Sequence, residues 1–133
     1  MNRELIPQLE PLVERLSEWR GSLVEVVEQL TRSPGTLDRH FTTTTTLVLR
    51  LEHVGIAFSG GSLLVLGRAF GRDVGYQAAV ERLERLSLGP EEVVFVERFG
   101  AAAERHSTFR RLAEAPDAEG LYELGSQEGA PRR

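Results

Sequence analysis

The sequence predicts a single-domain protein that is mainly α-helical. Three observations support this class. Apolar residues recur at heptad spacing through residues 5–30, two later segments (74–88 and 90–115) carry apolar residues at helical spacing, and the composition is globular. The chain has 133 residues, of which 41% are hydrophobic and 27% charged, which suits one compact domain.

The N-terminal segment, residues 4–32, carries the strongest pattern in the chain. Its apolar residues are spaced alternately four and three apart, and Glu, Gln and Arg fill half of the positions between them. Such a stripe is one face of a long amphipathic helix, or of two collinear helices, that packs against another helix. Pro7 and Pro11 fit a first turn, and Ser33-Pro34-Gly35 is a stop signal. The stripe consists of Leu5, Leu9, Leu12, Leu16, Trp19, Leu23, Val26 and Leu30.

The middle segment, residues 36–72, fits two templates. Five consecutive threonines (42–46) favour a strand, and the apolar runs on either side of Gly60-Gly61 are typical of a β-hairpin at about 46–70. Its alternation changes parity near His53, which requires a bulge there. Several apolar residues of this segment also lie on one helical face, so an all-α helical bundle is the alternative fold.

The C-terminal half predicts two further helices. Asp73 can cap the first, over about 74–88, and Gly89-Pro90 separates it from the second, which Pro116 ends. A short turn over 117–124 completes the predicted domain, 1–124. Residues 125–133 are expected to form a flexible tail.

Charge and composition exclude several classes of function. The net charge is −4, which opposes nonspecific nucleic-acid binding, and all basic residues are arginines, which suit protein interfaces. There is no cysteine, so thiolate metal sites and disulfides are excluded. The N-terminus lacks the pattern of a signal peptide, and no apolar stretch is long enough for a transmembrane segment. We therefore expect a cytoplasmic protein.

No motif predicts a catalytic, cofactor or metal site. The three histidines, His40, His53 and His106, lie in separate segments without metal-ligand spacing. The Ser59–Ser62 sequence contains two glycines but lacks the residues that complete a phosphate-binding loop, so a turn is the simpler interpretation. The threonine run is best interpreted as a cross-strand polar ladder.

These observations favour a non-enzymatic interaction or assembly module without a cofactor. Its expected partner is another protein or a second copy of the chain, bound through the eight stripe residues. Two alternatives remain at this point. One is a small enzyme or ligand-binding domain with a pocket near His53 and the 59–62 turn. The other is a peripheral membrane protein that uses residues 47–70.

Overall fold

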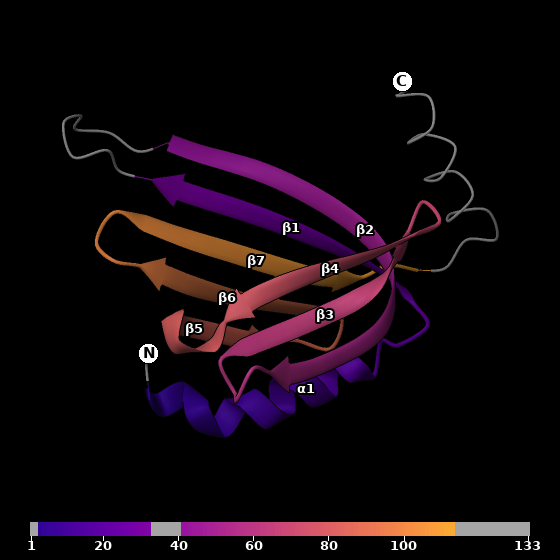
Figure 1. Ribbon diagram of the computed structural model, residues 1–133, viewed down its shortest axis with the longest axis horizontal. Coiled ribbons are helices and arrows are strands. Elements are labelled where there is room, and N and C mark those ends of the chain that lie inside the picture. Colours follow the sequence, from indigo (N-terminus) through magenta and orange to yellow (C-terminus); the bar gives the residue numbers. More distant parts are fainter. Residues whose placement is uncertain (1–2, 33–40, 114–133) are drawn as a thin grey trace.

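The computed structural model describes residues 3–32 and 41–113, and these form a curved antiparallel β-sheet with one α-helix (Figure 1). The mainly α prediction is therefore wrong, and so is the all-α alternative. The elements in chain order are η1 (Arg3–Gln8), α1 (Leu9–Ser17), β1 (Leu23–Arg32), β2 (Phe41–Ala57), β3 (Ser62–Ala69), β4 (Arg72–Ala79), η2 (Val80–Arg82), β5 (Leu83–Leu88), β6 (Glu92–Phe99) and β7 (Ala103–Arg111).

The seven strands lie in the order β4-β3-β2-β1-β7-β6-β5. Strands β1 to β4 form one meander and β5 to β7 form another, and the pairing of β1 with β7 joins them. The two outermost strands, β4 and β5, follow one another in the chain with only η2 between them. Three residues span at most about 10 Å. The sheet therefore curves until its two edges approach each other at that end.

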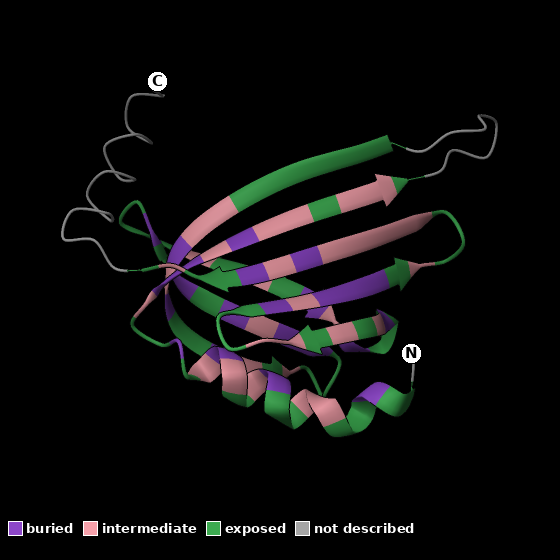
Figure 2. Cartoon of the chain, turned by 180° about the vertical axis from the view of Figure 1, so that it is seen from behind, coloured by how far each residue is buried: buried purple, intermediate pink, exposed green. Residues whose placement is uncertain are grey.

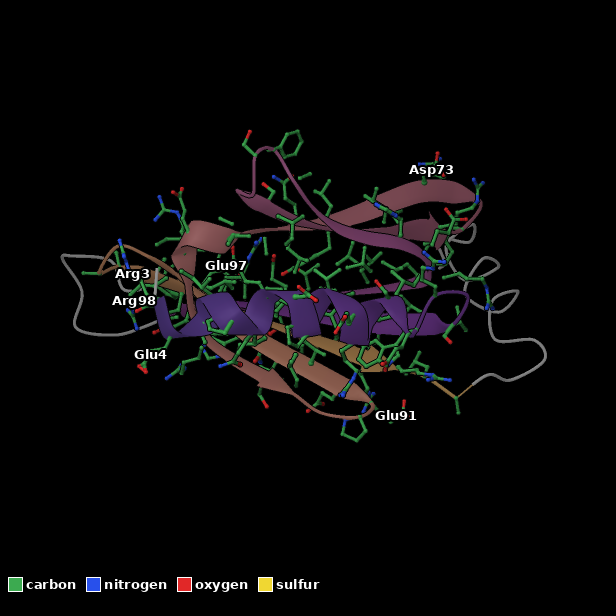
Figure 3. The ribbon with its side chains drawn as sticks, turned by 90° about the horizontal axis from the view of Figure 1, so that it is seen from below. Arg3, Glu4, Asp73, Glu91, Glu97 and Arg98 are labelled. Atoms are coloured by element: carbon green, nitrogen blue, oxygen red, sulfur yellow. The ribbon has the colours of Figure 1, made fainter. Side chains whose placement is uncertain are left out.

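The hydrophobic core fills the concave side of the sheet. Helix α1 lies between the β2–β4 half and the β5–β7 half when the molecule is viewed from below (Figure 3). The largest fully buried apolar side chains come from the helix segment and from strands on both sides of it. They include Leu12, Leu16, Trp19, Leu49, Leu51, Leu63, Leu83, Phe95 and Phe109.

The heptad stripe is divided between two kinds of structure, so its interpretation as one helical, coiled-coil-like face is wrong. Helix α1 ends at Ser17, and Gly21 then adopts a φ of +86°, a conformation that L side chains rarely adopt. The following residues include Val24, Val26 and Val27, whose branched side chains favour a strand.

The middle segment is the hairpin that the sequence favours. Strand β2 pairs with β3, and the register shifts between Leu51 and His53, which confirms the irregularity expected there. The turn differs from the expected two-residue Gly60-Gly61 turn. It spans residues 58–61, because Ala57 pairs with Ser62, and Phe58, Ser59 and Gly60 all have positive φ.

The two predicted C-terminal helices are also wrong. The first is replaced by β4, η2 and β5, and the second by the β6–β7 hairpin, whose turn contains Gly100 at a φ of +69°. Residues 93–96 form a continuous apolar run that is rich in valine, which suits a buried strand better than one face of a helix. The predicted turn over 117–124 and the tail over 125–133 lie outside the described residues, so the 1–124 domain boundary stays a prediction.

Candidate functional site

The eight stripe residues lie mostly inside the chain's own core. Leu5, Leu12, Leu16, Trp19, Leu23 and Val26 are buried, while Leu9 and Leu30 are half-buried. Intramolecular packing already accounts for the apolar character of the buried members. Their role in binding a partner is not tested by a single chain and stays a prediction.

The two described histidines and the glycine turn do not assemble into one site. His53 lies in β2, His106 lies in β7, and His40 lies outside the described residues. His106 Nε2 is 3.2 Å from Glu104 Oε1, and this hydrogen bond lowers the pKa of Glu104, as does the charge of Arg98. In the described ranges, 3–32 and 41–113, no three His, Asp or Glu side chains are grouped so as to hold a metal ion.

A cluster of polar side chains lies on the concave face of the sheet, beside the hydrophobic core. Sequence analysis missed it, because its charges interrupt the apolar alternation of the strands. We call it the clasp. It consists of Glu28 from β1, Tyr76 from β4, Glu97 from β6, and Arg105 and Ser107 from β7.

Arg105 is the centre of the clasp and uses each of its three guanidinium nitrogens. Nε donates to Glu97 Oε1 at 2.7 Å, one terminal nitrogen donates to Glu28 Oε2 at 3.2 Å, and the other donates to the backbone carbonyl of Gln77 at 2.7 Å. The guanidinium also lies 5.1 Å from the ring centroid of Tyr76. Burial opposes its charge, but the hydrogen bond and charge of Glu97, with those of Tyr76 and Glu28, raise the pKa of Arg105.

Glu97 and Tyr76 complete the clasp. Glu97 is fully buried, its Oε2 accepts the backbone N–H of Ala79 at 2.8 Å, and Figure 3 shows it among the interior side chains. The Tyr76 hydroxyl donates to Glu28 Oε2 at 3.3 Å and accepts from the Ser107 hydroxyl at 2.6 Å. Burial raises the pKa of Tyr76 to about 12, so this hydroxyl stays protonated at neutral pH.

The clasp hydrogen-bonds main-chain groups at the outer edge of β4. The N–H of Val80 donates to the carbonyl of Gly61, toward β3. Because successive residues of an antiparallel strand direct their N–H and C=O groups to opposite sides, Gln77 and Ala79 direct theirs away from β3. Those are the residues that Arg105 and Glu97 bind. Side chains of the clasp thus hydrogen-bond the outward main-chain groups of β4. The polar groups of the clasp also hydrogen-bond one another.

Strand β2 is different, because its first half has a strand partner on one side only in the part of the chain that the structure describes. Residues 41–50 pair with β1, but pairing with β3 begins at Arg50. Within the described residues, no strand pairs with the outer side of residues 41–48. We call this stretch the open edge. It extends from the body of the sheet in Figure 1, and Figure 2 shows its first residues as a continuous exposed stretch.

The backbone of the open edge has a defined orientation. The N–H of Leu51 donates to Ser22, and its carbonyl accepts from Gly21, so Leu51 faces the β1 side. By alternation, the odd residues from 41 to 49 also face β1, and the even residues face outward. The outward N–H and C=O groups therefore belong to Thr42, Thr44, Thr46 and Val48.

Among residues 3–32 and 41–113, none of the features that normally protect an edge strand is found at the open edge. Residues 41–49 read FTTTTTLVL, with no charge, proline or glycine. Charged side chains, proline, bulges and covering segments are the usual protections against strand addition. An uncharged edge whose outward main-chain groups pair with no described strand is a surface on which another strand can pair. The threonine run is visible in the sequence, but only the fold shows that the run lies at the edge of the sheet.

Comparisons with family models, with curated proteins and with solved structures returned no match. None of the helices in the described part of the chain combines the length and apolarity needed to cross a bilayer.

Proposed function

We propose that this chain is a non-enzymatic interaction module that accepts a β-strand of a protein partner along the open edge of β2. The observation that carries the proposal is the row of outward main-chain groups over 41–48, which no described strand pairs. A cytoplasmic location belongs to the same proposal, supported by the absence of cysteine from the sequence.

The dimensions of the open edge suit strand addition. Eight residues of antiparallel strand extend about 27 Å, which is longer than the average strand. At one end the edge is limited by β3, whose last residues pair with β2 near Arg50. An added strand continues the sheet beyond the β3–β4 turn, so main-chain hydrogen bonds supply the affinity and the side chains on the two faces supply the specificity.

The other candidate sites offer weaker support for a function. The clasp binds its own members, so its groups close the sheet rather than await a substrate. A hollow of about 290 Å³ adjoins it, lined by Glu28, Leu30, Arg32, Phe99, Ala103 and Arg105. For membrane association, the exposed Phe58 and Phe70 lie in the turns at opposite ends of β3, so they do not form one apolar patch.

The proposal is tested by adding an unrelated strand. The probe is an eight-residue peptide of alternating threonine and valine, flanked by arginines for solubility, and titrated into the ¹⁵N-labelled chain. We expect amide-exchange protection to rise at Thr42, Thr44 and Thr46, whose N–H groups face outward. Thr44→Pro removes one of these donors, so it should weaken peptide binding without breaking the β1–β2 ladder.

The matched control is a substitution on the edge that the clasp covers. Asp73→Pro alters an exposed residue near the start of β4 and should leave peptide binding unchanged. Binding that protects amides of β4 or β5 instead, or no binding up to millimolar peptide by the chain in its monomeric form, contradicts the proposal.

A further inference from the structure

We infer that the strand taken up by the open edge is the same edge of a second copy of this chain, which gives a two-fold symmetric dimer with a sheet continuous across both copies. This inference rests on the proposed function and names its partner. It is carried by the sequence and charge of residues 41–48, together with the orientation of their backbone groups.

The open edge is complementary to itself. In a symmetric antiparallel pair, outward residues must lie opposite outward residues. Placing Thr44 opposite Thr44 of the second copy pairs Thr42 with Thr46 in both directions. Because residues 42–46 are all threonine, every pair formed within this run juxtaposes two threonines, and cross-strand threonine pairs are favourable.

The residues that flank the threonines fit the same register. Phe41 and Leu47 share the concave face, because both have the parity of Leu49, which is buried in the core. The symmetric register sets Phe41 of one copy opposite Leu47 of the other, once at each end of the pair. Phe41 is 46% exposed in the single chain, so this contact removes apolar surface from water.

Charge favours a second copy at this edge and disfavours it at the others. The chain carries a net charge of −4, which repels identical copies in general, yet residues 41–49 carry no charge. The outer strand β4 begins with Arg72 and Asp73, and β5 contains Glu84, Arg85 and an irregular register between Leu83 and Arg85. These features protect β4 and β5, so self-pairing is directed to β2.

The inference is tested by introducing charges at Thr44, the residue that faces its own copy at the proposed two-fold axis. Thr44→Glu and Thr44→Arg each place two like charges directly opposite one another, which is unfavourable across a strand pair. We expect light scattering to show a dimer for the native chain at micromolar concentration, and a dissociation constant raised at least about fivefold for each variant alone. An equimolar mixture of the two variants should recover the dimer, because the opposite charges then face each other.

A second measurement uses the absence of cysteine from the sequence. Thr44→Cys introduces the only thiol in the chain, and Cα atoms of directly opposed residues lie within the range that a disulfide can bridge. Mild oxidation should cross-link this variant much faster than Asp73→Cys, whose side chain is 88% exposed on β4. Equal rates for the two variants overturn the inference.

The outcomes separate the two proposals. A native chain that stays monomeric at all concentrations, while the threonine–valine peptide still protects Thr42, Thr44 and Thr46, overturns the second copy and leaves strand acceptance standing. A dimer whose dissociation constant is unchanged in both charge variants overturns this interface. A native chain that neither binds the peptide nor forms a dimer overturns both proposals.

Discussion

The outer edges of β4 and β2 end the sheet in two different ways. On β4, the outward groups of Gln77 and Ala79 are bound by the side chains of Arg105 and Glu97, which reach across from β7 and β6. On β2, the outward groups of residues 42–48 have no strand partner among the described residues. The same backbone groups are thus hydrogen-bonded by side chains of the chain at the β4 edge, whereas at the β2 edge no described strand pairs with them.

The difference shows that side chains determine whether the outward main-chain groups of an edge strand are hydrogen-bonded within the chain. The clasp brings charges into the concave face, where an unpaired charge is costly, so its members must stay together. The open edge has mostly short threonine side chains, which reach only the neighbouring strand, as in the 3.0 Å contact between the hydroxyls of Thr31 in β1 and Thr42 in β2. An edge without long charged side chains can neither cover itself nor repel a partner.

The largest effect is expected from breaking the clasp. Arg105→Ala leaves the fully buried Glu97 without its charged partner, which should lower the free energy of unfolding by about 3–5 kcal/mol. Urea unfolding followed by the fluorescence of Trp19, the one tryptophan in the sequence, measures this loss.

The control for that measurement is Arg110→Ala. Arg110 lies in the same strand and pairs with Glu25 at 2.8 Å, but its side chain is 53% exposed, so its loss should cost under about 1 kcal/mol. If the two arginine variants unfold at the same urea concentration, the clasp does not close the sheet.

A smaller and local effect is expected at the open edge. The N–H of Thr45 faces β1, so Thr45→Pro removes a ladder hydrogen bond opposite Glu28 and should lower the local opening free energy by about 2 kcal/mol. The N–H of Thr44 faces outward, so Thr44→Pro should leave that ladder nearly intact.

Amide exchange at Leu30 and Arg32, which face β2 from the same stretch of β1, reports the difference between the two proline variants. Faster exchange in the Thr45 variant alone supports the assigned orientation. Equal acceleration in both variants shows that the even residues of β2 do not face outward.

The smallest effect concerns the hydroxyl of Tyr76. Burial raises its pKa from 10.0 to about 12, so the folded state favours the neutral form. This stability is fully present below pH 10 and is lost as the pH rises from 10 toward 12. Tyr76→Phe should cost about 1 kcal/mol at neutral pH through the lost hydrogen bonds, and it should remove this alkaline loss.

The titration can be followed by absorbance of the tyrosinate. The sequence has two tyrosines, so Tyr122→Phe leaves Tyr76 as the one that titrates. A titration midpoint near pH 10 in that variant shows that the Tyr76 hydroxyl is not buried and hydrogen-bonded. Such a result contradicts the clasp as the group that covers the β4 edge.

Sequence reasoning succeeded where turn signals were local and failed where two periodicities coincided. The hairpin of β2 and β3 followed from apolar runs around Gly60 and Gly61, because a reversal of direction depends on neighbouring residues. The heptad stripe was misleading because its spacing continued past Gly21 by coincidence. In β1, Leu23 and Val26 lie on opposite faces of the strand, although a helix would place them on one face.

The clasp escaped prediction for a physical reason. Glu97 and Arg105 stand at inward positions of β6 and β7, where alternation leads one to expect apolar side chains. A charge at such a position is stable only when a partner from a distant strand meets it, and that partner cannot be identified before the sheet order is known. The open edge required the same knowledge, because the threonine run does not reveal which strand lies beside it.

The short η2 connection has a consequence for how the molecule is assembled from its chain. It is the single covalent link between two meanders that otherwise meet through the β1–β7 ladder, which runs from Val24–Arg111 to Arg32–Ala103. Contacts within each meander are local, whereas the ladder closes the longest loop, so we expect the meanders to form before the ladder. A chain cut between Glu81 and Arg82 should therefore yield two fragments that recombine through the β1–β7 pairing. Recombination of the two fragments would then report directly on the formation of that ladder.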